Sequence, residues 1–350
     1  MQKSLTQWGL SHIERYLKGH FSLFQNTAYH KLANHAAFYS FATGFIITLL
    51  LASAEVYFVT RSQIELNLET VLLLVLLNVG LIAIEFWLLF HIGFQACARY
   101  IQELEKQHPL NPELKHALVE AILELEESKT TPFNLDLQRH TPKHHWLSLL
   151  LYKFKVMLSN ALAKLIINRL LSRSAARGYV PLISTVITGF WDAWVQLNCL
   201  KEVRLRLSAH LYTQRLIKTL QQSDYPQATR HVLIRIIAVR LELMGRYSLA
   251  LSHMLQELET EQAGSVSGCE RLFDPILMAQ HYQALPILEQ HKLAEIACAL
   301  LAFKRQRLSK KEQHWLTLFT LNKQQLKQCR QQLDCPVRQS HTLITLPVKV

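Results

Sequence analysis

Two long apolar runs in tandem near the N-terminus constrain this chain more than any other feature of its sequence. Residues 38–59 and 71–98 each reach the ~20 residues that cross about 30 Å of hydrocarbon as a helix. The connector between them is short and polar. The pattern predicts a transmembrane hairpin over residues 38–107, with spans at about 38–59 and 71–95. The alternative is a hairpin enclosed in the core of a large soluble protein.

The distribution of lysine and arginine around the two runs predicts their orientation. Cytosolic loops of membrane proteins carry an excess of these residues. The connector holds only Arg61, whereas Lys18 and Lys31 precede the first run and Arg99, Lys106 and Lys115 follow the second. We therefore expect a multi-pass protein of the bacterial inner membrane with both termini in the cytosol.

Composition favours helices throughout the chain and places most of its positive charge in one segment. The 350 residues include only 10 Gly and 10 Pro, which favours long helices over strands and tight turns. The net charge is +12, and residues 144–250 hold 15 Lys and Arg against 4 Asp and Glu. Beside a membrane anchor, such a segment is expected to face anionic headgroups. No RNP-like, zinc-finger or Gly-rich motif accompanies it, so no nucleic-acid partner is expected.

The predicted fold is all-α, with a transmembrane helical hairpin followed by a cytosolic helical bundle. Composition and punctuation divide the chain into six parts. These are N-terminal amphipathic helices (1–37), the hairpin (38–107), an acidic helix and linker (108–145), a basic membrane-proximal helical domain (146–262), a second helical bundle (269–335) and a C-terminal tail (336–350).

Two polar residues in the second apolar run are candidate functional sites. A carboxylate in a spanning helix is costly to insert, which makes Glu85 a site hypothesis by default. Asn78 lies seven residues earlier, on the same helical face. The favoured interpretation is adhesion, to hydroxyls of the first helix or to a second copy of the chain. An oligomeric pore or transporter built from such hairpins is the less favoured alternative.

Residues 179–200 are apolar but contain Asp192, Gln196 and Asn198. We expect a buried or membrane-grazing hairpin here, with a third membrane span as the alternative. Asp192 in an apolar setting needs a partner. The candidates are four arginines, Arg169, Arg173, Arg177 and Arg204. A structural ion pair is favoured over an active-site acid.

Cysteine and histidine usage predicts neither a disulfide framework nor a metal site. The six cysteines form no CxxC pair, which is typical of reduced, mostly buried thiols. His140, His144 and His145 cluster in the linker, but no further ligand stands at matching spacing. No cofactor is expected.

One stretch of the basic domain resembles a known family. Its order is Arg173, Arg177 and Pro181, then Phe190-Trp191-Asp192-Ala193-Trp194-Val195, then Glu202-Val203-Arg204-Leu205-Arg206. This order resembles an uncharacterised family of bacterial membrane proteins over residues 145–260. In that family a Trp-Asn-Ala-Trp-like motif ends an apolar segment, so Asp192 replaces its Asn. The resemblance implies a membrane-associated helical protein and supplies no reaction.

A second resemblance covers residues 285–334. Leu308-Ser309-Lys310-Lys311-Glu312 fits the second half of the Asp-Gly-x-Leu-Ser-x-x-Glu turn of TerB-like domains. Ser309 and Glu312 also form a capping-box pattern. Lys304 and the three residues after it replace the acidic first half, so the metal binding that this turn implies is not expected. The bundle is expected to be basic at that corner, and Arg235, Arg240 and Arg246 are expected to mark another basic edge.

No catalytic signature accompanies these features. The sequence contains no GxSxG, P-loop, Rossmann or HExxH motif. The leading hypothesis is therefore a membrane-anchored, non-enzymatic interaction protein that binds anionic lipid or an acidic protein partner. The hairpin is the expected contact in any homo-oligomer. The alternative is an enzyme acting at the membrane surface with Asp192 in its site.

Overall fold

The computed structural model describes residues 2–18, 23–24, 27–61, 68–105, 112–123, 180–222, 225–244, 248–260, 273–304 and 308–333. Within these ranges the chain forms α-helices and no strands, as the sequence predicts. The chain divides into two compact units. The first comprises residues 1–103 and 141–201, and the second comprises residues 104–140 and 202–350.

Several predictions concern residues outside these ranges. They include the linker histidines, Arg169, Arg173, Arg177, Arg246, the apolar segment 146–172 and the tail 336–350.

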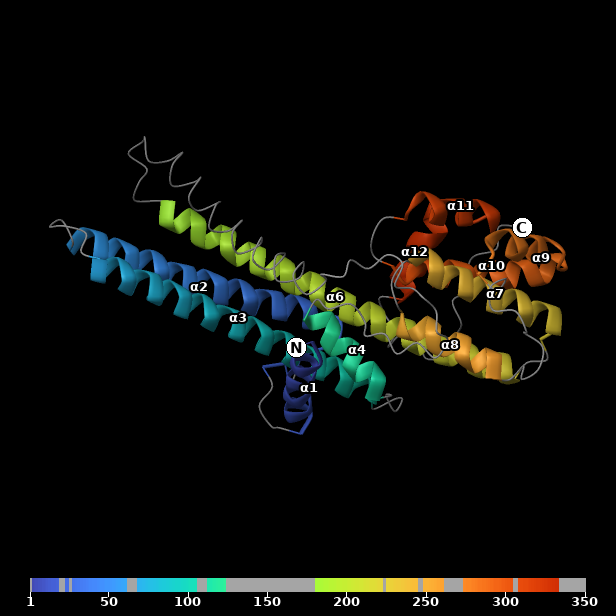
Figure 1. Cartoon of the computed structure of the whole chain (residues 1–350), viewed down its shortest axis with the longest axis horizontal. Helices are drawn as coiled ribbons and strands as arrows, with labels where there is room; N and C mark the ends of the chain where they lie inside the picture. The colour runs from blue at the N-terminus through green and yellow to red at the C-terminus, as the bar shows by residue number, and fades with distance from the viewer. Residues whose placement is uncertain are drawn as a thin grey trace. The chain divides into compact units, whose positions relative to one another are not determined.

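The first unit contains α1 (Gln2–Lys18), α2 (Leu32–Arg61), α3 (Leu68–Glu105) and the first part of α6 (Val180–Gln222). The helices α2 and α3 run antiparallel (Figure 1), and the rings of Tyr29, just before α2, and Tyr100, near the end of α3, lie 4.8 Å apart. Both helices extend beyond the predicted spans. The stretches long and apolar enough to cross a membrane are Leu32–Ala54 and Val75–Glu105.

The apolar side chains of these two helices are largely exposed. Only 6% of the most apolar part of α3 is buried, and 39% of that of α2. Large apolar side chains on their surfaces include Phe38, Ile46, Leu50, Leu72, Val75, Leu76, Val79, Ile84 and Trp87. A hairpin enclosed in a soluble core would have these side chains buried, so that alternative does not fit α3.

The N-terminal helix α1 packs on α3 through aromatic side chains. The Trp8 ring lies 5.5 Å from that of Phe94, and the Tyr16 hydroxyl hydrogen-bonds to Nδ1 of His91. The predicted amphipathic N-terminal segment therefore turns its aromatic face onto the second long helix.

The second unit is a helical bundle whose hydrophobic core is formed by residues between Ala209 and Leu333. It contains α4 (Pro112–Ile122), α6 from Glu202, α7 (Gln227–Met244), α8 (Leu249–Thr260), α9 (Pro275–Gln283), α10 (Ile287–Ala302), α11 (Lys310–Leu318) and α12 (Lys323–Leu333). The helix α7 contacts α8, α9 and α10, and α10 contacts α12. Because α7 and the second half of α10 are buried almost all round, they form the centre of the core.

Local sequence signals explain where several of these helices begin. Pro112 opens α4, and Pro275 stands in the first turn of α9 behind the Asp274 cap. Ser309 and Glu312 form the predicted capping box at the start of α11.

The prediction of a hairpin over residues 179–200 is wrong. A single helix, α6, runs from Val180 through Gln222 without a break. Pro181 stands in its first turn, where proline is compatible with a helix because the missing N–H has no intrahelical partner there.

Candidate functional site

The helices α2 and α6 approach each other closely within the first unit. At Gly44 of α2 a Cβ atom would lie 2.0 Å from Oδ2 of Asp192 and 3.4 Å from Cα of Gly189. At Gly189 of α6 it would lie 2.9 Å from the carbonyl oxygen of Phe41. Real Cβ atoms do not approach that closely. At Gly189 the neighbour is backbone, so this glycine is required for the contact, whereas a Cβ at Gly44 would displace the Asp192 carboxylate. We call the contact of Gly44, Gly189 and Asp192 the α2–α6 seam.

Small residues on α2 and polar residues on α6 are buried at helical spacing on both sides of the seam in the sequence. On α2, small residues recur at every fourth position and are all buried: Ala36, Ser40, Gly44, Thr48 and Ala52. On α6, the buried residues at helical spacing are polar: Thr185, Thr188, Asp192 and Gln196. Rows of small residues that let backbones approach, with polar side chains between the helices, are typical of helix pairs in membranes.

The opposite face of α6 carries large apolar side chains that are exposed. They are Val186, Ile187, Phe190, Trp191 and Trp194, and Phe190 and Trp194 are each more than half exposed. The first part of α6 is therefore polar inside and apolar outside.

Asp192 lies in the seam, and its surroundings agree only in part with the sequence interpretation. The residue is 7% exposed and has interactions within the structure. Arg204 is not its partner on a continuous helix, because twelve residues at ~1.5 Å each separate the two by about 18 Å. The other three arginines proposed for it, Arg169, Arg173 and Arg177, lie outside the described residues.

Glu85 and Asn78 lie on α3, and both are half-buried with interactions in the structure. Two hydroxyls of α2 donate to carbonyls of their own helix. Thr43 donates to the carbonyl of Tyr39 at 2.9 Å, and Ser53 donates to that of Leu49 at 2.8 Å.

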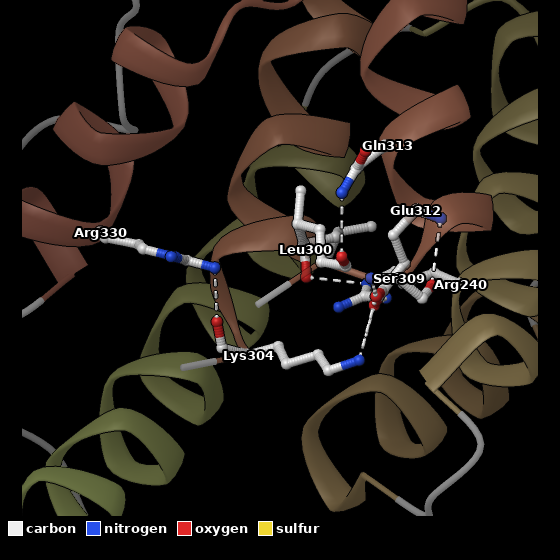
Figure 2. A network of polar contacts seen from close by, with 8 residues as sticks. Arg240, Leu300, Lys304, Ser309, Glu312, Gln313 and Arg330 are labelled. Atoms are coloured by element: carbon white, nitrogen blue, oxygen red, sulfur yellow. Dashed lines mark hydrogen bonds and ion pairs between the residues drawn. The ribbon is translucent and has the colours of Figure 1, made fainter. Parts of the chain in front are cut away.

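A buried ion cluster in the second unit was not predicted. Glu312 and Arg240 are both fully buried, and Nη1 of Arg240 lies 2.6 Å from Oε1 of Glu312 (Figure 2). Nζ of Lys304 lies 3.2 Å and 3.0 Å from the two carboxylate oxygens, and the Ser309 N–H donates to Oε2 at 2.7 Å. We call Arg240, Lys304, Ser309 and Glu312 the Glu312 cluster.

The cluster ties four parts of the bundle together. Arg240 comes from α7, and its Nε also donates to the carbonyl of Leu300 in α10 at 3.1 Å. Arg330 of α12 donates to the carbonyl of Lys304 at 2.8 Å. Glu312 itself belongs to α11. Because Arg240 is fully buried, the prediction that it marks a basic edge is wrong. The charge of Lys304, expected on a basic corner, is also turned inward.

Hydrogen bonding dominates the ionisation of Glu312. Burial alone would raise the pKa of this carboxyl. The backbone N–H of Ser309 and the side chains of Lys304 and Arg240 oppose it, and together they lower the pKa to about 2. Since all three donors stabilise the carboxylate and none leaves it open to a substrate, the cluster is suited to hold the bundle together.

Sequence signals for this cluster were incomplete. The capping-box pattern found Ser309 and Glu312. Arg240 follows Ile236 and Ile237 and precedes Met244 at helical spacing, so it stands on an apolar face of α7. This position among apolar residues is the sequence feature that could have predicted the burial of Arg240.

Two other buried pairs lie in the same bundle. His210 of α6 and His253 of α8 have ring centroids 6.2 Å apart, and burial followed by the charge of His253 lowers the pKa of His210 to about 4. The Sγ atoms of Cys298 and Cys329 are 3.1 Å apart, and both are free thiols. The hydrogen bond from Cys329 and burial raise the pKa of Cys298, so both thiols are suited to a packing role.

Within the described ranges, no group of three or more His, Cys, Asp or Glu side chains is placed to hold a metal ion. Comparison with known protein families, characterised proteins and solved structures finds no match to this chain.

Proposed function

We propose that this protein is a membrane-anchored, non-enzymatic interaction protein of a bacterial inner membrane. The first unit is its anchor, and the second unit is a helical bundle that the anchor presents at the cytosolic surface. The observation that carries the proposal is the exposure of the apolar faces of α2 and α3, because soluble proteins rarely expose apolar patches of this extent.

The charges at the helix ends support cytosolic termini. Lys31 stands just before α2, and Arg99 lies in the last turns of α3. The α6 helix runs antiparallel to α2 (Figure 1), so its Lys201 end lies at the same end of the first unit. An excess of Lys and Arg at that end matches the cytosolic side of a membrane protein.

The Glu312 cluster supports a structural interpretation of the most unusual charged group in the second unit. An acid–base catalyst needs a pKa near the working pH and access to substrate. Glu312 has a pKa of about 2 and is fully buried by its own partners. We therefore propose that the bundle over residues 269–335, part of which resembles TerB-like domains, recruits other proteins through its surface.

The basic segment 144–250 supplies the surface for anionic lipid. The described positive residues nearest to the anchor are Lys201, Arg204 and Arg206 on α6. Positive charge immediately after a membrane helix attracts anionic headgroups, at about 1 kcal/mol per residue near the surface.

Lysine reactivity in defined lipid tests this part of the proposal. Full-length protein is placed in nanodiscs of phosphatidylcholine, alone or mixed with phosphatidylglycerol, and is exposed to a water-soluble acylating reagent. Contact with anionic headgroups predicts at least twofold slower modification of Lys201 in the mixed lipid, and 0.5 M salt should restore its rate because salt screens the attraction. Lys218 lies about 25 Å further along the continuous helix α6, so it should react at the same rate in both lipids.

Lys311 of α11, which is exposed and lies outside the basic segment, is the internal control. Equal rates of Lys201 modification in the two lipids would refute the proposed binding to anionic lipid. The acidic-protein alternative would then predict salt-sensitive crosslinks from the same lysines to a protein partner.

A further inference from the structure

We propose that residues 180–200 of α6 form a third membrane-embedded segment, and that lipid acyl chains cover its exposed face of Ile187, Phe190, Trp191 and Trp194. The proposal rests on the membrane anchoring of α2 and α3 proposed above. It adds a segment beyond the two stretches Leu32–Ala54 and Val75–Glu105 that are long and apolar enough to cross a membrane.

The depth of the α2–α6 seam is the first reason. Gly44 lies twelve residues from the beginning and ten residues from the end of the apolar stretch Leu32–Ala54. At ~1.5 Å per residue the contact is about 18 Å and about 15 Å from the two ends, which is near the middle of the stretch. Because Asp192 and Gly189 touch α2 at this level, they share its environment.

The distribution of polarity on α6 is the second reason. Helices in soluble proteins bury their apolar face and expose their polar face. This segment buries Thr185, Asp192 and Gln196 and exposes Phe190 and Trp194. Polar side chains of membrane helices face the interior of the helix bundle, where they find partners, and apolar side chains face lipid. The buried position of Asp192 removes the main objection to insertion.

The chemistry of the exposed face identifies lipid as its occupant. Faces that pack on other membrane helices carry small residues, as the seam does. The outer face of α6 carries a phenylalanine and two tryptophans instead. Trp194 is seven residues before Lys201, about 10 Å along the helix, which is the spacing expected of an aromatic residue below the cytosolic headgroups.

The position of charge along α6 limits the embedded part. Between Val180 and Leu200 the only charged residue is Asp192, and Lys201, Glu202, Arg204 and Arg206 follow directly. The embedded segment therefore ends at about residue 200, at the end of the first unit where α2 begins.

Quenching of tryptophan fluorescence by brominated lipid tests the proposal in the full-length protein. A background variant keeps Trp315, which is 3% exposed in the core of the second unit, and has phenylalanine at the other five tryptophan positions. One variant restores Trp194, and a second restores Trp87, which is 54% exposed on α3. Each is reconstituted in phosphatidylcholine with and without bromine on the acyl chains.

We expect the brominated lipid to quench the added emission of Trp194 at least half as strongly as that of Trp87, with Trp315 unchanged. Quenching of Trp87 without quenching of Trp194 would overturn the third segment and leave the anchor intact. That result would also arise if residues 146–172 or a second copy of the chain covered this face. Absence of quenching at both tryptophans would overturn the anchor itself.

Discussion

Replacing Glu312 by glutamine tests whether the Glu312 cluster holds the second unit together. Glutamine has nearly the same shape but carries no charge, so Arg240 and Lys304 remain buried without their anion. Removing one partner of a buried ion pair costs about 3–5 kcal/mol, because the other charge is left uncompensated.

The ionisation of Glu312 gives an independent figure of the same size. A pKa of about 2 in the folded chain against an ordinary value of 4.5 corresponds to about 3 kcal/mol of folding free energy at neutral pH. A loss of this size raises the population of the opened bundle roughly 100-fold or more, since each 1.4 kcal/mol is tenfold.

The buried thiols of the bundle provide a local assay. Full-length protein in detergent is incubated over a urea series and given a short pulse of a thiol-alkylating reagent. Mass spectrometry then measures modification of the peptides that contain Cys298 and Cys329, which are fully buried in the second unit. Cys97 and Cys199 report on the first unit in the same samples. The Glu312→Gln variant should expose Cys298 and Cys329 at a lower urea concentration than the unmodified protein does. The reactivity of Cys97 and Cys199 should be unchanged.

Glu257→Gln is the matched control, since the Glu257 side chain is 44% exposed beside His253 and an exposed pair contributes about 0–1 kcal/mol. Adding Arg240→Met to Glu312→Gln should recover part of the loss, because one unpaired buried charge is removed. A Glu312→Gln variant that loses less than about 1 kcal/mol would refute the role assigned to the cluster.

Three further predictions follow from the geometry. The stability that Glu312 contributes should be fully present above about pH 5 and should be lost as the pH falls toward 2, because its folded pKa lies below the unfolded one. An acid titration followed by circular dichroism measures this loss, and Glu312→Gln should lack this step. His210 has a folded pKa of about 4, so stability should also fall between about pH 6.5 and pH 4, and His210→Gln should abolish that part of the fall. In the first unit, Gly44→Val should lower the unfolding free energy of the detergent-solubilised protein by about 1–3 kcal/mol through overpacking. Gly80→Val is the control, because a Cβ there meets nothing within 4 Å, and it should have at most the small effect of a helix-surface substitution. Equal effects of the two substitutions would contradict the seam.

The long helices were predictable because each apolar run is long enough to form a helix of 20 residues or more. The two long apolar helices and the capping box at Ser309 follow from local signals. Such signals depend only on residues within a few turns of one another, and a single sequence contains them in full.

The errors have a common physical cause. Arg240 was placed on a surface because charge usually indicates exposure, but Glu312, 72 residues later, compensates it in the core. Asp192 and Gln196 were counted against a continuous helix in residues 179–200, but the row of small residues on α2 accommodates that polar face. In both cases the partner lies far away in the sequence, and only the fold brings the two together.

Membrane extraction of the full-length protein tests the central claim, that α2 and α3 lie in a bilayer. Membranes from producing cells are washed with alkaline carbonate, sedimented, and then treated with a mild detergent. The account predicts that the protein stays in the carbonate-washed pellet and is released only by detergent. Recovery of folded protein in the detergent-free supernatant would contradict it.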